Sequence, residues 1–168
     1  MIAKSYILAN LDRLDRLYND FAASKKGALF CAKLAIIELC GWIEVSMDDM
    51  VSRCANRNLR EVDNRKHVNS RVIKRIHGFE YDQHFRGMLA QVVGLKEVEK
   101  LEGRVDAAKF AKMRASLSAL KLRRDDLAHT YLKGMTPVLD APSLTKLRFL
   151  DVYDGLSELE AGMKKLRL

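Results

Sequence analysis

The spacing of apolar residues constrains this chain more than any other feature, because it follows a helical period almost from end to end. Only two prolines and nine glycines interrupt the 168 residues, so long helices can form. No segment shows the alternating pattern of a strand. We therefore predict an all-α fold. The period is clearest near the end of the chain, where the apolar positions are Phe149, Val152, Leu156, Leu159, Met163 and Leu166.

The same spacing predicts an up-and-down bundle of four to five helices that forms a single domain over residues 1–168. Asp106 is a candidate N-cap of the fourth helix, and Gly134 is a candidate C-cap. Ser143 or Thr145 could cap the last helix. The expected helices cover about residues 2–23, 26–57, 67–101 with a break at Gly78 or Gly94, 106–133, and a final segment after residue 143.

The helix predicted for residues 26–57 carries two apolar stripes, which indicates a central position in the bundle. Glu44 lies among these stripes, and we interpret it as a residue at the solvent-facing rim, because a buried carboxylate needs a donor. One stripe contains Phe30, Leu34 and Ile37, and the other contains Ile36, Leu39, Ile43 and Met50.

The overall charge favours a polyanionic partner. The formal net charge is +8 and the pI is about 9.5, which is typical of proteins that bind nucleic acid. The three cysteines, Cys31, Cys40 and Cys54, are an odd number in an apolar helix, so we expect buried reduced thiols. There is no signal-peptide pattern, and no apolar run approaches the roughly 20 residues that span a bilayer. We expect a cytoplasmic protein that does not insert into a membrane.

Arg124 and His129 are the residues that point to chemistry. Arg124 occupies an apolar position of its helix, where a charge is costly unless it is paired or used. His129 follows near the helix end, within reach of Asp125 and Asp126, so it is expected to be protonated easily near neutral pH. Histidine can transfer the protons of RNA cleavage, and arginine can neutralise charge on the phosphate, without any metal. Positions five apart point about 140° from each other on a helix, so two copies related by a two-fold axis could complete one site.

The segment 124–131, with its Arg-x4-His-x-Tyr pattern, resembles the HEPN superfamily, and in particular the toxins paired with MNT-type nucleotidyltransferase antitoxins. The resemblance implies a HEPN-like helical domain that acts as a homodimeric, metal-independent endoribonuclease, in toxin–antitoxin or phage-defence systems. Arg124 and His129 would be catalytic, and Asp125 would orient them. Tyr131 would be the residue modified by the antitoxin, and we expect Arg123 to add an RNA contact. No cofactor is implied.

In this family the residue after the arginine is often Asn, whereas here it is Asp125. A second arginine, Arg123, directly precedes Arg124, so the motif could also be counted from Arg123. We expect residues 56–105 to form an extra segment compared with the compact toxins.

Two other functions remain open from the sequence. The chain could be a non-catalytic helical module that binds a protein partner or nucleotide, with Arg124 as an interface anchor and His129 as a cap. It could also be a nucleic-acid-binding regulator, because residues 57–75 are strongly basic, although they show no helix-turn-helix signature.

Overall fold

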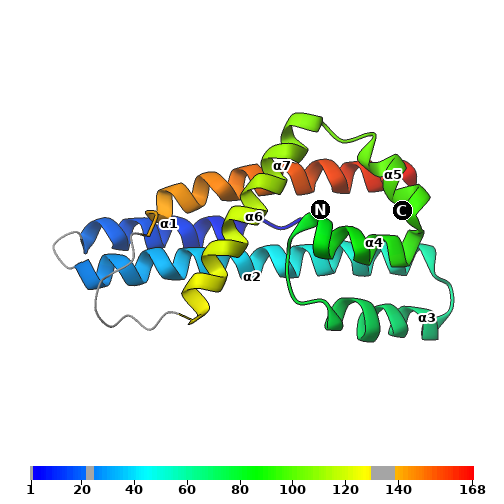
Figure 1. The fold of residues 1–168 in the computed structure, drawn as a ribbon, viewed down its shortest axis with the longest axis horizontal. Coiled ribbons are helices and arrows are strands. Elements are labelled where there is room, and N and C mark those ends of the chain that lie inside the picture. The colour runs from blue at the N-terminus through cyan, green and yellow to red at the C-terminus, as the bar shows by residue number, and fades with distance from the viewer. Residues whose placement is uncertain (1, 22–24, 130–138) are drawn as a thin grey trace.

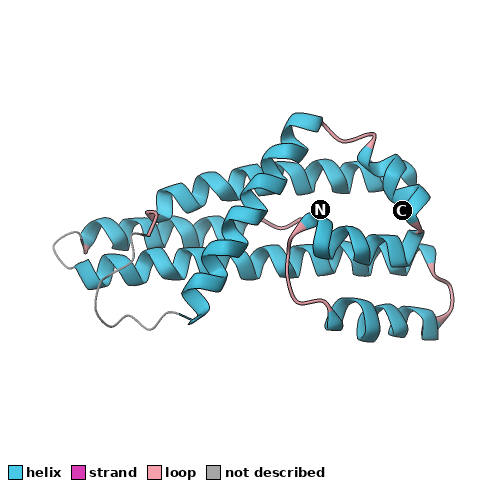
Figure 2. Ribbon diagram, in the orientation of Figure 1, coloured by secondary structure: helices cyan, strands magenta, loops and turns pink. Residues whose placement is uncertain are grey.

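The computed structural model describes residues 2–21, 25–129 and 139–168, and all of the regular structure in these ranges is helical (Figure 2). The all-α prediction is therefore confirmed for the described part of the chain. The elements are α1 (Ser5–Asp20), α2 (Lys25–Asn58), α3 (Val62–His67), η1 (Val68–Val72), η2 (Ile73–Arg75), η3 (Tyr81–Phe85), α4 (Arg86–Val93), α5 (Leu95–Glu102), α6 (Ala107–His129) and α7 (Pro142–Leu166).

Four long helices build the frame of the molecule. Figure 1 shows α1, α2 and α7 along the long axis, with α6 crossing them obliquely. The helix α2 packs against α1, α4, α6 and α7, and α6 packs mainly against α7. The crossing of α6 over α2 matters for function, because it brings the Arg124 segment against the middle of α2.

The helical periods of the sequence correspond to the buried faces. In α1, Ile7, Leu11 and Leu14 are buried, and in α7 every predicted apolar position from Phe149 to Met163 is buried. Burying one such side chain stabilises the fold by roughly 1.5–3 kcal/mol relative to leaving it exposed. Local periodicity therefore identified the core faces of α1 and α7 correctly.

The third predicted helical region differs from its prediction. It breaks at both candidate glycines, because Gly78 has φ +149° and Gly94 has φ +84°, values that other residues rarely adopt. Among the described residues there are consequently seven α-helices and three short helical turns rather than four to five helices. The oblique α6 also departs from a simple up-and-down bundle.

One apolar stripe of α2 is buried and the other is exposed to solvent. The stripe with Ile36, Leu39 and Ile43 is buried, as expected for a central helix. The other stripe faces outward, so α2 contacts α1, α4, α6 and α7 as a central helix does, but the rest of the described chain leaves this stripe uncovered. We call this exposed surface the α2 stripe; it consists of Phe30, Leu34, Ile37, Gly41 and Val45.

The helix starts give one confirmed cap and one correction. Asp106 accepts a hydrogen bond from the backbone N–H of Lys109 at 2.9 Å, as an N-cap residue does. The final helix begins at Pro142, earlier than either predicted cap, and no side chain caps it. Proline is favourable there because its missing N–H would have no partner in the first turn. The C-cap candidate Gly134 lies outside the described residues.

The cysteine prediction is confirmed, since Cys31, Cys40 and Cys54 are all buried and free. A search of the described helices finds none with the length and hydropathy that a membrane span requires.

Candidate functional site

Arg124 lies on the buried face of α6, as the sequence predicts. Leu117, Leu120 and Leu127 on the same face are almost fully buried. The Arg124 side chain keeps 26% of its surface exposed, so its stem is covered while part of the guanidinium reaches the surface. The helix period sets this position, because Arg124 takes an apolar place in an otherwise apolar row.

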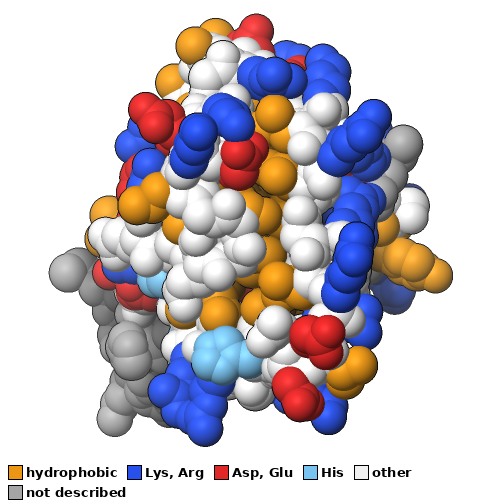
Figure 3. Space-filling model, turned by 90° about the vertical axis from the view of Figure 1, so that its right-hand side faces the viewer, with side chains coloured by type: hydrophobic (Ala, Val, Ile, Leu, Met, Phe, Trp, Pro, Cys, Tyr) orange, Lys and Arg blue, Asp and Glu red, His pale blue; other side chains and the backbone are white. Residues whose placement is uncertain are grey.

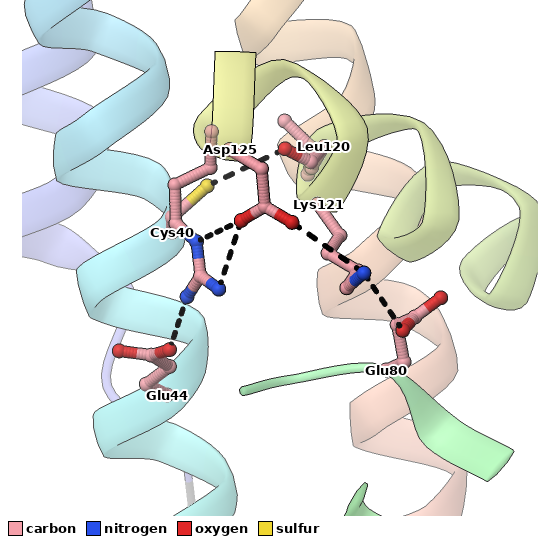
Figure 4. A network of polar contacts seen from close by, with 7 residues as sticks. Cys40, Glu44, Glu80, Leu120, Lys121 and Asp125 are labelled. Carbon is pink, nitrogen blue, oxygen red and sulfur yellow. Dashed lines mark hydrogen bonds and ion pairs between the residues drawn. The ribbon is translucent and has the colours of Figure 1, made fainter. Parts of the chain in front are cut away.

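The guanidinium of Arg124 has contacts on three sides, and Figure 4 shows the two that involve carboxylates. Its Nη1 donates to Glu44 Oε1 of α2 at 2.5 Å, and its Nε and Nη2 each lie 3.3 Å from Asp125 Oδ1. Its Cζ lies 5.0 Å from the centre of the Phe79 ring, a cation–π distance. These contacts fix the orientation of the arginine and connect α6 to α2.

Glu44 lies at the rim, as the sequence predicts, because its side chain is 37% exposed, and it is also the ion-pair partner of Arg124. The sequence contains a signal for it, since a carboxylate among apolar stripes needs a donor. Its partner lies 80 positions along the chain, so no local pattern could identify Arg124 as that donor.

A lysine extends the network toward the segment before η3. Lys121 Nζ lies 3.4 Å from Asp125 Oδ2 and 3.8 Å from Glu80 Oε2. Partial burial by itself would raise the pKa of the Asp125 carboxyl, but hydrogen bonds from Arg124 and Lys121 outweigh it and lower that pKa below its usual range. Asp125 thus remains ionised at neutral pH, and its Oδ1 contacts the Arg124 guanidinium.

The second side of the site is formed by α2 and the segment of residues 76–80. Burial and the nearby Glu44 raise the pKa of Asp48, one turn along α2, while His77 acts in the opposite direction. The sequence did not identify His77, Phe79, Glu80 or Lys121 as residues close to Arg124.

A thiol lies beneath the network. The Cys40 Sγ is 4.0 Å from the carbonyl oxygen of Leu120, and burial raises its pKa to about 12. A thiol with this pKa stays protonated at neutral pH and is a poor nucleophile. Cys40 is consequently a packing residue at the α2–α6 contact.

The other predicted site residues are described only in part. His129 is the last residue of α6, but its side chain is not described, so the expected contacts from Asp125 and Asp126 are untested. Tyr131 lies outside the described residues. Arg123 is half-buried beside Arg124. The structure thus brings Arg124 and Asp125 together and leaves the distance to His129 undetermined.

Two observations concern how this site could bind a metal ion or a phosphate. Within residues 2–21, 25–129 and 139–168, no three His, Cys, Asp or Glu side chains are arranged to hold a metal ion. Because Glu44 and Asp125 occupy the donors of Arg124, a phosphate that binds there must approach its exposed edge or displace one of the carboxylates.

Comparisons of this chain with protein-family models, with curated proteins and with solved structures find no match.

Proposed function

We propose that this protein is a HEPN-type, metal-independent endoribonuclease that acts as a homodimer, in a toxin–antitoxin or phage-defence setting. The observation that carries the proposal is Arg124, a partly exposed arginine on the buried face of α6, held by Glu44, Asp125 and Phe79. It lies five positions before His129, at the end of a long helix in an all-helical chain. A nucleotidyltransferase antitoxin that modifies Tyr131 would be the matching partner.

In the proposed reaction the ribose 2′-oxygen attacks the adjacent phosphorus and the bond from phosphorus to the 5′-oxygen breaks. The products are a 2′,3′-cyclic phosphate and a 5′-hydroxyl. His129 either removes the proton from the 2′-hydroxyl or gives a proton to the leaving 5′-oxygen, and water takes or supplies the other proton. Arg124 stabilises the negative charge that grows on the phosphate oxygens, and Asp125 keeps the guanidinium oriented.

The α2 stripe is the surface that we propose for the second copy. Phe30 is 58% exposed and Val45 is 67% exposed, and a single apolar band of this kind is typical of an interface. Gly41 at its centre has open space where a Cβ would be, so two helices can approach closely there. Because Glu44 flanks the α2 stripe and holds Arg124, a second copy bound here would lie beside the site.

Charge complementarity favours an antiparallel pairing of the two stripes. Basic residues flank the first half of the stripe, at Lys26 and Lys33, and acidic residues flank the second half, at Glu44, Asp48 and Asp49. In an antiparallel pair, which a two-fold axis perpendicular to the helices produces, the basic half of one copy meets the acidic half of the other.

Purified protein tested for RNA cleavage in EDTA checks the proposal. We expect the wild type to cut single-stranded RNA and to leave 2′,3′-cyclic phosphate ends, and Arg124→Ala and His129→Ala to lose at least about a hundredfold in rate. Arg104→Ala, at an exposed arginine of the loop before α6, is the matched control and is expected to cut normally. Equal cleavage by wild type and His129→Ala would refute the assigned site.

A second function, a non-catalytic helical interaction module, is favoured by the contacts of Arg124 themselves. All three of its guanidinium nitrogens already contact carboxylates, which is what an anchor between α6 and α2 needs. On this reading Arg124→Met lowers stability, and neither the wild type nor any variant cuts RNA. Wild-type cleavage that Arg124→Met abolishes, with folding intact, would exclude it.

A further inference from the structure

The strongest concentration of positive charge lies away from Arg124, in the segment of residues 57–75. Within it only Glu61 and Asp63 are acidic. The basic residues, which we call the basic segment, are Arg57, Arg60, Arg65, Lys66, Arg71, Lys74 and Arg75.

These cations have almost no internal partners, and all but Arg65 are exposed. The single ion pair within the segment joins Lys66 to Asp63 at 3.4 Å, with the two side chains 73% and 92% exposed, so it contributes little. Arg57 donates to the carbonyl oxygen of Leu168. By contrast, the arginines at positions 53, 86, 114, 124 and 148 each contact a carboxylate.

The local structure turns the basic segment outward. Val68 and Val72 are buried against the core and anchor η1, which leaves Arg71, Lys74 and Arg75 on the solvent side. Figure 3 views this end of the molecule and shows many Lys and Arg side chains around a band of apolar ones. Like charges held this close repel one another, and an anionic ligand relieves that repulsion.

A groove with hydrogen-bond donors lies inside the basic segment. It runs between α2 and the α3–η1 stretch, and its polar lining consists of Ser52, Asn56, Arg65, Lys66 and Asn69. Hydroxyl, amide and cationic groups are those that contact phosphate and sugar in complexes with nucleic acids. The groove therefore offers what a phosphate backbone binds.

The basic segment leads directly into the Arg124 site. The chain passes from Arg75 through His77, which acts on Asp48, to Phe79, whose ring lies beneath the Arg124 guanidinium. In Figure 1 both the α3 helix and the last part of α6 project below α2. Residues 76–80 therefore connect the basic segment to the Arg124 site, and an RNA strand bound to the basic segment would follow them to that site.

We infer that the basic segment and its groove bind the phosphate backbone of single-stranded RNA and guide it to the Arg124 site. The guiding role rests on the proposed ribonuclease function, whereas the binding role does not. An anionic membrane is a poorer match, because Val62 is the only large apolar side chain exposed in this segment, and membrane-binding helices insert an apolar face.

The test is the binding of a fluorescent 2′-O-methyl oligoribonucleotide, which cannot be cut, to wild type and to the variant Arg60→Gln/Arg71→Gln/Lys74→Gln/Arg75→Gln. Each phosphate contact contributes about 0.7 to the slope of log affinity against log salt. We expect the variant to bind about tenfold or more weakly at roughly 0.1 M salt, with a slope shallower by about 2–3. The control Lys96→Gln/Arg104→Gln/Lys112→Gln/Lys165→Gln removes the same charge from exposed positions elsewhere, and it is expected to bind within about twofold of wild type.

Equal weakening of both variants, or an unchanged variant, would overturn the inference, as would wild-type binding to phosphatidylserine vesicles but not to RNA. Circular dichroism checks that each variant is folded. If the fourfold variant of the basic segment does not fold, the double variant Lys74→Gln/Arg75→Gln replaces it, and the expected change in the salt-dependence slope is then about half as large. Because the oligonucleotide cannot be cut, specific binding without cleavage of ordinary RNA would refute the ribonuclease alone. Cleavage with binding that does not depend on the basic segment would refute this inference alone.

Discussion

The contact between α6 and α7 at Gly155 makes the sharpest prediction about this fold. A Cβ at Gly155 would lie 2.4 Å from Met113 Cβ and 2.8 Å from Met113 Cγ and Sδ. Carbon atoms in contact normally lie about 3.5–4.0 Å apart, so Gly155→Ala requires a displacement of roughly 1 Å or more. Met113 Cβ is attached to the backbone and cannot rotate away, so α6 itself has to move.

The expected change in the free energy of unfolding of Gly155→Ala is the sum of two opposing contributions. Overpacking of this kind costs about 1–3 kcal/mol, and the upper half applies here because the clash is with a Cβ. Alanine gains about 1 kcal/mol over glycine from helix propensity. We therefore expect a net loss of about 1–2 kcal/mol in the free energy of unfolding, which corresponds to roughly 2–8 °C in Tm for a chain of this size.

Gly87→Ala in α4 is the matched control, because a Cβ at Gly87 meets nothing within 4 Å. It is expected to gain about 0.5–1 kcal/mol. At Gly162 the closest atom is Leu101 Cδ1 at 2.6 Å, the movable end of a side chain, so Gly162→Ala is expected to lie between the two.

Urea denaturation followed by circular dichroism measures all three variants. If Gly155→Ala were as stable as Gly87→Ala, the close α6–α7 approach would be wrong. A shifted α6 would also move Arg124 relative to Glu44, so this contact bears on the functional site as well.

Three further predictions concern the site. Burial raises the pKa of Cys40 to about 12 and that of Cys54 to about 11, so neither thiol is expected to react with a thiol reagent at about pH 8 until the protein unfolds. Burial and, to a smaller extent, the nearby Glu44 raise the pKa of the Asp48 carboxyl. The folded state therefore binds the carboxyl proton more tightly than the unfolded state does. The resulting stabilisation is lost as the pH rises from about 3.9, the value of an unperturbed Asp, through the raised pKa. Asp48→Asn is therefore expected to be more stable than wild type at neutral pH, with a difference that shrinks below about pH 4. A double-mutant cycle between Glu44→Gln and Arg124→Gln is expected to give a coupling of about 1 kcal/mol, because the pair is charged but partly exposed.

A specific result would contradict each of these three predictions. Rapid labelling of the native thiols, in a chain whose Cys31 is replaced by serine, would contradict their burial. A less stable Asp48→Asn at neutral pH would mean that the ionised carboxylate is stabilised by its surroundings. A coupling near zero would show that the ion pair between α2 and α6 does not form in solution.

The comparison of sequence with structure is most instructive at α2. Its apolar period predicts a long helix, and the helix extends over Lys25–Asn58. The same period contains two stripes, and it does not say which of them the rest of the chain covers. Ile36 and Leu39 are buried, whereas Phe30 and Leu34 are not. Coverage depends on where α4, α6 and α7 pack, which is a property of the whole chain.

The candidate site also has one part that the sequence predicts and another that depends on tertiary packing. Sequence alone placed Arg124 on the apolar face of a helix that ends near His129, because a helical period is local and each residue's position on it follows from counting. The resemblance to HEPN proteins also depends only on that short segment. Both the helix and the placement of Arg124 on its buried face are confirmed.

The partners of Arg124 could not be read from the sequence. Glu44 lies 80 positions away and Phe79 lies 45 positions away, and they meet the guanidinium only because α6 crosses α2 and because the chain breaks at Gly78 beside it. The sequence by itself determined the helices, their apolar faces and the charge of the basic segment, since these depend on neighbours a few residues apart. Only the tertiary structure decided which carboxylates hold Arg124, which stripe of α2 stays open and that Phe79, just beyond the basic segment, lies against the guanidinium, because these depend on packing between distant helices.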